Sequence, residues 1–306
     1  MSVKMEVTVE KTSIEKKGTL FVFLTGFIRI KGVVNWSAIS FFGFLLGTSS
    51  LNFFSYMIPF FFFIVSTFFI LAFTFAINNY YDIDSDKENP RRVGVNAMAS
   101  GKISKQTGIF LSIIFVVIPL LLSLLYKFEV FVFCSLLIIW MWAYSAPPLR
   151  LKGRPGIDVL WHFVAFVALV LWGSYLAGSI TLINALAAIS IGIFGCIAQV
   201  DNHIRDYSFD KASGSKTFAV WAGINQAKTI LILFVIIHII FLFPLIVLYC
   251  VYDLLTILIL CLGTIIALFV VKIKKDPFVP SLYYFIIVFG ASVYICCFIY
   301  HINRFF

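Results

Sequence analysis

Residues 58–86 read IPFFFFIVSTFFILAFTFAINNYYDIDSD, a long and mostly apolar run that passes directly into Asn78, Asp82 and Asp86. A helix of about 20 apolar residues can cross the roughly 30 Å hydrocarbon core of a bilayer. The rest of the chain agrees, since 62% of its 306 residues are hydrophobic and 36 are Phe. This composition excludes an ordinary soluble domain. We therefore predict an all-α polytopic membrane protein.

Nine apolar runs are long enough to span a bilayer. Their approximate ranges are 33–49, 58–80, 108–125, 129–146, 157–178, 181–202, 228–249, 252–272 and 280–303. We expect residues 1–306 to form a single membrane-embedded domain. Its first part, residues 1–17, is polar and is expected to be cytoplasmic.

Basic residues predict the orientation of these helices. If the helices are threaded in order, only Lys127 and Arg304 among the 23 Lys and Arg residues fall opposite the N-terminus. The positive-inside rule then makes four loops cytoplasmic, at residues 81–107, 147–156, 203–227 and 273–279. Topology thus explains the net charge of +9, so the charge is no argument for a nucleic-acid partner.

An acidic triplet occurs twice, 124 residues apart, as Asn78, Asp82 and Asp86 and as Asn202, Asp206 and Asp210. Spacing by four residues places each triplet in one stripe of a helix. An even number of helices separates the copies, so both face the same side and the chain reads as two parallel pseudo-repeats. Carboxylates at the end of a helix meet the negative end of its dipole, which a divalent cation would offset. Ligands that are all oxygen suit Mg²⁺ shared with substrate phosphates.

At these positions the chain resembles the UbiA superfamily of intramembrane prenyltransferases. The family signature N-D-x-x-D-x-x-x-D is similar to residues 78–86, and N-x-x-R-D-x-x-x-D-x-x-x-G-x-K-T is similar to residues 202–217. Between them YSAPPLRLK, residues 144–152, is similar to the family loop Y-S-x-P-P-x-R-L-K. The resemblance covers most of the chain. It implies a helical bundle around a central cavity and Mg²⁺-dependent transfer of an isoprenoid group from its diphosphate to a lipophilic acceptor in the cell membrane.

The resemblance also implies roles for individual residues. The four aspartates would hold the metal, which we expect to be two Mg²⁺ ions, and Asn78 and Asn202 would either ligate it or orient the aspartates and bound water. Tyr144 would face the reacting end of the prenyl chain. The groups expected to bind diphosphate are Asn78, Arg91, Arg150, Lys152, Asn202, Arg205, Lys211 and Lys216. Cations placed there would act where charge develops on the leaving oxygen.

Two departures from the family pattern bear on the site. Asn79 replaces the Asp that often follows the first Asn, which lowers the local negative charge. Asp84 is then an alternative ligand for the metal. Asn96-Ala97 replaces the usual R-P pair. The acceptor therefore stays open between a quinone or aromatic precursor, geranylgeranylglyceryl phosphate and a carotenoid.

Three further polar residues have more than one interpretation. For Asp201 three roles stay open: a base that acts through another residue of the site, an additional group next to the metal, or a charge at the end of a helix. Asp158 either polarises an acceptor or serves as the acidic residue favoured at a helix N-terminus. His203 either binds an acceptor or packs.

A secondary transporter is the alternative function from another class. Transporter sites usually lie near the bilayer midplane on broken helices, whereas these acidic groups lie at predicted helix ends. A scaffold without catalysis is the third possibility, and it leaves the repeated ligand spacing unexplained.

Overall fold

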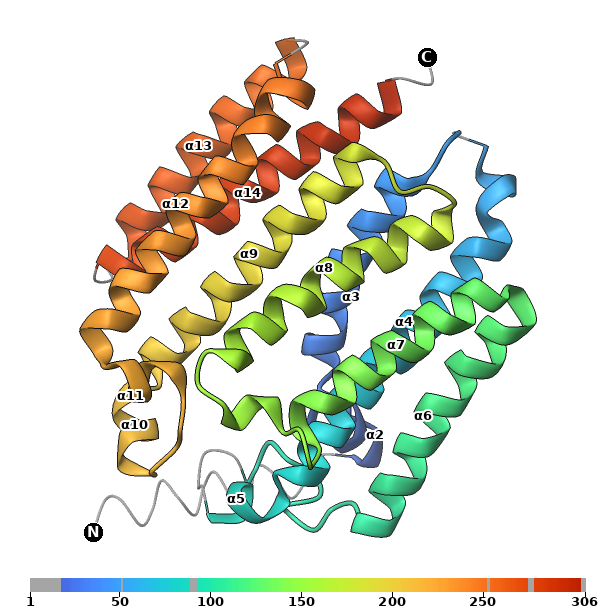
Figure 1. The fold of residues 1–306 in the computed structure, drawn as a ribbon, viewed down its shortest axis with the longest axis vertical. Coiled ribbons are helices and arrows are strands. Elements are labelled where there is room, and N and C mark those ends of the chain that lie inside the picture. The colour runs from blue at the N-terminus through green and yellow to red at the C-terminus, as the bar shows by residue number, and fades with distance from the viewer. Residues whose placement is uncertain (1–17, 51, 89–92, 252–253, 275–277, 304–306) are drawn as a thin grey trace. The chain divides into compact units, whose positions relative to one another are not determined.

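The computed structural model describes residues 18–50, 52–88, 93–251, 254–274 and 278–303, which contain helices and no strand (Figure 1). The long helices are α3 (Ile30–Gly47), α4 (Phe53–Tyr81), α6 (Lys105–Tyr126), α7 (Phe128–Ser145), α8 (Ile157–Ala177), α9 (Leu182–Arg205), α12 (Ile224–Tyr249), α13 (Leu254–Lys274) and α14 (Phe278–Asn303). The short elements are α2 (Thr19–Val22), η1 (Phe23–Phe27), α5 (Ile83–Glu88), η2 (Leu151–Gly153), α10 (Tyr207–Ala212) and α11 (Phe218–Ala222).

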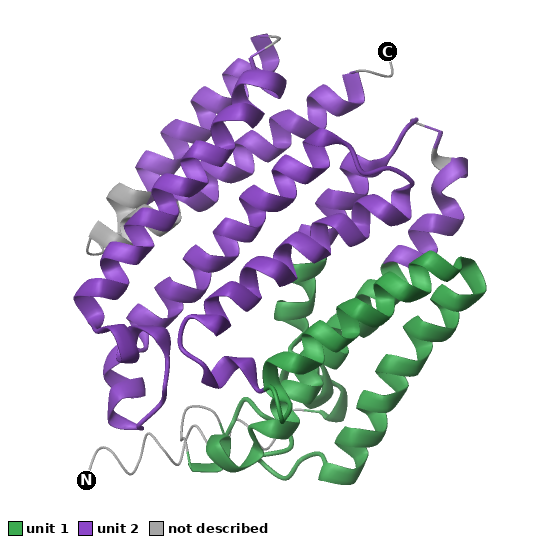
Figure 2. Cartoon of the chain, in the orientation of Figure 1, with its two compact units in different colours: residues 1–38, 64–149 green, residues 39–63, 150–306 purple. Residues whose placement is uncertain are grey.

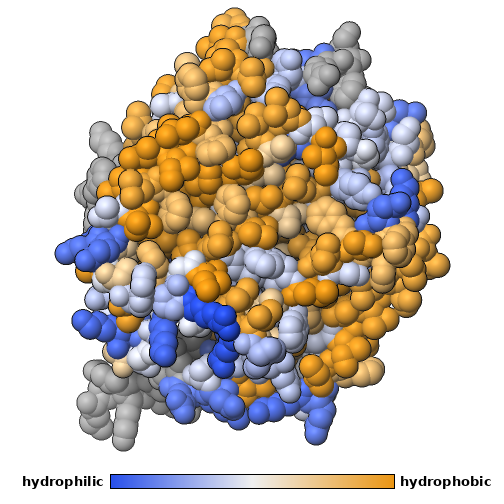
Figure 3. Space-filling model, viewed as in Figure 1, coloured by the Kyte–Doolittle hydropathy of each residue, from blue (hydrophilic) through white to orange (hydrophobic). Residues whose placement is uncertain are grey.

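Each of the nine predicted spans corresponds to one long helix, so the all-α prediction is confirmed. Within the described residues, eight helices are long and apolar enough to cross a membrane, whereas α13 has a shorter apolar stretch, Leu254–Val270. The count of nine spans is therefore approximate. Apolar residues cover much of the face drawn in Figure 3. Many large apolar side chains are exposed, such as Leu125, which is 82% exposed. The N-terminal segment 1–17 lies outside the described residues.

Local chemistry sets several helix boundaries. Ser104 caps α6 by accepting a hydrogen bond from the amide of Thr107 at 3.0 Å, which satisfies one of the free donors of the first turn. Thr181 and Asn184 form a capping box at the start of α9. Gly178 ends α8 with φ of +120°, a backbone conformation that glycine adopts without steric cost.

The chain divides into two compact units, residues 1–38 with 64–149 and residues 39–63 with 150–306 (Figure 2). In the first unit, α6 and α7 pack as a helical hairpin. The second half of α4 packs on the start of α3, where the rings of Trp36 and Phe75 lie 5.6 Å apart. This unit carries the first acidic motif.

The second unit contains the end of α3, the start of α4, η2 and helices α8 to α14. Small residues let α3 approach α8 closely: Ser174 donates to the carbonyl oxygen of Gly43 at 2.9 Å, and Ser40 donates to that of Leu169 at 2.8 Å. Helix α9 packs against α8, α12 and α14, with Ile197 and Leu231 in its buried core. The C-terminal end of α9 carries the second acidic motif.

Candidate active site

The first acidic motif spans the junction between α4 and α5, with Asp82 as the turn residue between the two helices. The amide of Asp82 donates to the carbonyl oxygen of Asn78 at 3.1 Å, and the amide of Asp86 donates to that of Asp82 at 2.8 Å. These two bonds keep the four-residue spacing of a helix across the junction, at which Asp82 belongs to neither helix. Asn78 and Asp82 are half-buried, and Asp86 is only 8% exposed.

The second motif repeats this arrangement at the end of α9. Asp206 donates to the carbonyl oxygen of Asn202 at 3.0 Å, and Asp210 donates to that of Asp206 at 2.9 Å. Asp206 joins α9 to α10 with φ −89° and ψ 2°, in the sparsely populated bridge region where active-site residues are often found. Asn202 is exposed, and the two aspartates are half-buried.

The two copies thus share a local structure as well as a spacing. In each, a long apolar helix ends within the motif and a helix of six residues follows, α5 in one case and α10 in the other. The same two i to i+4 backbone bonds bridge each junction. Each motif presents a column of amide and carboxylate oxygens at the end of a long apolar helix.

A buried network of amide groups surrounds the first motif. The Nδ2 of Asn96 donates to Asp86 Oδ2 at 2.9 Å and to the carbonyl oxygen of Asn79 at 2.8 Å. The Nδ2 of Asn79 in turn donates to the carbonyl oxygens of Gly26 and Phe27, at 3.0 and 2.9 Å. A carboxylate could not donate these bonds, which gives a physical reason for Asn79 where the family often has Asp.

Arg29 and Ser145 complete the surroundings of this motif. Arg29 has φ of +50° and donates to Asn79 Oδ1. Asn78 Nδ2 donates to the hydroxyl of Ser145 at 2.9 Å, which ties α4 to the end of α7 beside Tyr144. Asp84, the alternative ligand, has an 89% exposed side chain that pairs with Lys105 at 3.8 Å.

Buried polar contacts also support the second motif. Nε2 of His203 lies 3.2 Å from Oδ2 of Asp158 and 2.9 Å from the side chain of Gln199. Asp158 and His203 are 1% and 5% exposed, so this contact joins α8 to α9 away from water. Asp201 pairs with Arg205 at 2.7 Å. His203 directly follows the first residue of its motif, Asn202, just as Asn79 directly follows Asn78. His203 and Asn79 are both buried, and each side chain connects its helix to a neighbouring segment.

The basic residues expected to bind diphosphate have varied environments. Arg150 is exposed with φ of +38° and precedes η2, which contains the half-buried Lys152. Lys211 is exposed and lies over the ring of Tyr207, 5.7 Å from its centroid. Lys216 is exposed. Arg205 is engaged with Asp201, and Arg91 lies outside the described residues.

Several residues around the motifs have contacts that sequence reasoning missed. The bonds of Asn96 to Asp86 and of Ser145 to Asn78, and the contact of Asp158 with His203, all join residues that are distant along the chain or in different elements. The available signal was the departure at Asn96 and the position of Ser145 in the family-like loop. Neither signal names a partner.

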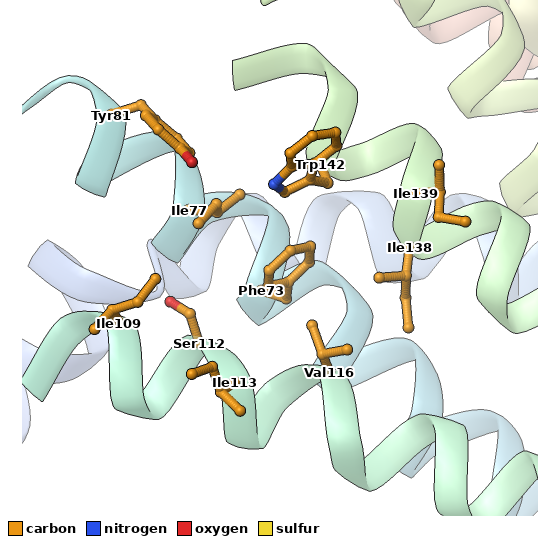
Figure 4. A pocket seen from close by; sticks show the side chains of 10 residues that line it. All are labelled: Phe73, Ile77, Tyr81, Ile109, Ser112, Ile113, Val116, Ile138, Ile139 and Trp142. Carbon is orange, nitrogen blue, oxygen red and sulfur yellow. The ribbon is translucent and has the colours of Figure 1, made fainter. Parts of the chain in front are cut away.

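An apolar pocket of about 330 Å³ lies between α4, α6 and α7 in the first unit (Figure 4). Its volume falls in the range of roughly 300–1,000 Å³ of small-molecule sites. Tyr81 and Ile109 lie at one end of it, and Val116 and Ile138 at the other. The remaining lining residues are Phe73, Ile77, Ser112, Ile113, Ile139 and Trp142. Ile77 and Tyr81 directly precede Asn78 and Asp82, so the pocket begins beside the first motif.

Comparison with known proteins identifies the family of the chain. The model of the UbiA prenyltransferase family matches residues 34–288, which is most of the sequence. The chain belongs to this family. With eight long apolar helices among the residues that the structure describes, this UbiA-family member is a multi-pass membrane protein.

Curated relatives match part of this UbiA-family chain. A lycopene elongase/hydratase of Corynebacterium glutamicum is 31% identical over 159 residues, covering 50% of the chain and 54% of that protein. A digeranylgeranylglyceryl phosphate synthase of Thermococcus sibiricus is 28% identical over 159 residues, covering 52% and 54%. The chain thus spans about half the length of the curated relatives it matches.

Solved structures share the UbiA fold over most of the chain. A UbiA homolog from Archaeoglobus fulgidus bound to GPP and Mg²⁺ has a TM-score of 0.64 at 20% identity, covering 90% of this chain and 98% of that one. A digeranylgeranylglyceryl phosphate synthase has a TM-score of 0.69 at 17% identity, covering 93% and 99%. At these identities the likeness establishes the fold.

The residues of this UbiA-family chain fit a magnesium site of a particular kind. No three His, Cys, Asp or Glu side chains converge into a ready-made metal centre within the described ranges. Each motif instead supplies two carboxylates and one side-chain amide at four-residue spacing. Mg²⁺ is commonly bound by one or two carboxylates, with substrate phosphates and water completing the shell.

Proposed function

We propose that this protein transfers an isoprenoid group from an allylic prenyl diphosphate to a lipophilic acceptor, with Mg²⁺ as cofactor. One observation carries the proposal above the others. In both N-x-x-x-D-x-x-x-D motifs the same pair of backbone bonds links the Asn to the first Asp and the first Asp to the second, at the ends of two apolar helices. Membership of the UbiA prenyltransferase family supports it, as do relatives named for lycopene elongation and for digeranylgeranylglyceryl phosphate synthesis.

We assign the metal ligands to the two acidic motifs. Asp82, Asp86, Asp206 and Asp210 would hold Mg²⁺, which when bound neutralises charge on the leaving diphosphate. Asn78 donates its amide nitrogen to Ser145, which leaves Oδ1 as its ligand atom. Asn202 is assigned the same part in the second motif.

Basic residues would contact the phosphate oxygens that the cation leaves open. We assign this part to the side chains that fall inside or next to the family-like segments, namely Arg91, Arg150, Lys152, Arg205, Lys211 and Lys216. Fixed cations stabilise a leaving diphosphate because its charge grows as the allylic C–O bond breaks. Tyr144 would face the allyl cation, since an aromatic ring attracts positive charge to its face.

The hydrocarbon part of a substrate would lie in the pocket between α4, α6 and α7. The pocket is lined mainly by apolar groups and begins at Tyr81, one residue before Asp82. A dry, apolar wall also protects an allyl cation from water. The lining at Val116 and Ile138 would then limit the length of chain accepted.

The reaction would take place at the cytoplasmic side of the cell membrane, in one domain formed by residues 1–306. All but two of the 23 Lys and Arg residues fall on the side of the N-terminus when the helices are threaded in order. The positive-inside rule makes that side cytoplasmic, and both motifs belong to its loops. Reaction of Cys-substituted loop residues with an impermeant thiol reagent in sealed vesicles tests this orientation.

The function itself is tested by product analysis. Purified protein is supplied with allylic diphosphates of increasing length, Mg²⁺ and a lipid extract, and products are identified by mass. The expected result is transfer that is lost with EDTA, and the mass increment identifies both donor and acceptor. The extract is compared with geranylgeranylglyceryl phosphate, a carotenoid and a quinone precursor as single acceptors. Saturable uptake of the diphosphate into vesicles without any product would instead indicate a transporter.

A further inference from the structure

Asn96 lies in the segment between α5 and α6 and has no exposed surface. Its Nδ2 donates two hydrogen bonds, to Asp86 Oδ2 at 2.9 Å and to the carbonyl oxygen of Asn79 at 2.8 Å. Its Oδ1 accepts from the amides of Met98 and Ala99, at 3.0 and 3.3 Å. A side-chain amide has two donor hydrogens and two acceptor sites, so the hydrogen-bonding capacity of Asn96 is fully used.

The partner of Asn96 is a nearly buried carboxylate. Asp86 is 8% exposed, and among the described residues Asn96 is the one side chain that hydrogen-bonds to it. A neutral amide fixes the orientation of a carboxylate without cancelling its charge. A buried negative charge without a positive partner is unfavourable, and a bound cation removes this cost.

The same network reaches the N-terminal part of the first unit. The carbonyl oxygen of Gly26 accepts from Asn79 Nδ2 at 3.0 Å and from the amide of Ala97 at 2.9 Å. A Cβ at position 26 would lie 3.2 Å from the Cβ of Ala97, so these segments are in close contact. Asn79 and Asn96-Ala97, the two departures from the family pattern, therefore meet in one network.

We infer that Asn96 is a positioning residue for Asp86: it holds Oδ2 and leaves the other carboxylate oxygen directed to a divalent cation. Groups that hydrogen-bond to a metal-ligating carboxylate orient it, and their loss typically weakens metal binding roughly 10–100-fold. The inference rests on the proposed function, because it takes Asp86 as a metal ligand.

The test measures binding of Mn²⁺ alone to the full-length protein in detergent, by electron paramagnetic resonance. It compares the wild type with Asn96→Ala, Asp86→Ala and the double variant. We expect Asn96→Ala to raise the Kd roughly 10–100-fold, and to raise it less than about threefold further once Asp86 is already Ala. Such non-additivity is the mark of residues that act as one unit.

The matched control is Asn184→Ala. Asn184 is also a fully buried amide, which donates to Ser174 at 2.9 Å and accepts from the amide of Thr181 at 2.8 Å, at the start of α9. Its substitution is expected to lower the unfolding temperature and to leave the Kd for Mn²⁺ unchanged. This result separates a general loss of packing from a specific effect on the cation.

Two outcomes would overturn the inference alone. In the first, Asp86→Ala weakens Mn²⁺ binding while Asn96→Ala does not. In the second, Asn96→Ala costs the same factor with and without Asp86. Wild-type affinity in the Asp86→Ala variant would instead remove the metal assignment of the proposed function, and the inference with it.

Discussion

Asp206 donates its backbone amide to the carbonyl oxygen of Asn202 at 3.0 Å, and Asp82 forms the same bond to Asn78 at 3.1 Å. The repeat found in the sequence is therefore also a repeat of local structure. These bonds join backbone atoms, so the aspartate side chains can be changed while the bonds are kept.

We predict that Asp82→Asn and Asp206→Asn each lower turnover at least about 100-fold, since each removes a charge that acts in the transition state. The shape and the backbone bonds are retained, so the unfolding temperature should change little. The measurement is diphosphate release under saturating Mg²⁺.

Asp84→Asn is the matched control for these variants. Asp84 lies in the same short helix as Asp86, but its side chain is 89% exposed and pairs with Lys105. Its substitution should leave turnover near that of the wild type. A loss at Asp84 equal to that at Asp82 would contradict the assigned ligands.

Val116→Phe should shift substrate choice toward shorter allylic diphosphates. Val116 lines the far end of the pocket from Tyr81, so a larger side chain shortens the space for a hydrocarbon chain. The ratio of kcat/KM between a long and a short donor is the quantity to measure. Val117→Phe is the control, because Val117 is 43% exposed and does not line the pocket. If both variants show the same selectivity, the hydrocarbon chain of the substrate does not bind in this pocket.

Gly173→Ala should destabilise the second unit by about 1–3 kcal/mol through overpacking. A Cβ at position 173 would lie 1.9 Å from the carbonyl oxygen of Ser40 and 2.6 Å from the amide of Phe44, so α3 and α8 would have to move apart. Thermal unfolding in detergent measures the effect. At Gly153 an added Cβ meets nothing within 4 Å, and Gly153→Ala should unfold like the wild type.

Asp158→Ala should lower stability by about 1–3 kcal/mol, because it leaves the buried Nε2 of His203 without its carboxylate partner. Glu129→Ala is the comparison: Glu129 is also an acidic residue in the first turn of a long helix, but it is exposed. Chemical denaturation of both variants checks the prediction. A similar small effect at both positions would show that the α8–α9 contact contributes little.

Much of the fold could be predicted because it depends on local composition. The apolar run ending at Asn78 is too long and too hydrophobic for a soluble helix, and in hydrocarbon only a structure that satisfies its own backbone can span. The boundaries were less accurate. Helix α4 begins at Phe53 rather than near residue 58, and it carries Pro59 inside it. A proline is unfavourable inside a helix, so the sequence pattern did not predict the earlier start.

The site was only partly predictable. The four-residue spacing of Asn78, Asp82 and Asp86 predicts a stripe because the period of a helix is known in advance. The hydrogen bond from Asn96 to Asp86 could not be predicted from a helical period. It depends on how an irregular segment folds back onto the end of a helix.

The sequence by itself determined the all-helical membrane architecture, the duplicated acidic motif and the family. The first follows from composition and the second from spacing along the chain, and the family follows from the resemblance of three segments to its signatures. Only the tertiary structure decided that Asn79 binds the carbonyl groups of residues 26 and 27, that Asn96 holds Asp86, and that His203 meets Asp158. Buried polar groups must find partners wherever the fold brings them, and the linear sequence does not specify which residues those are.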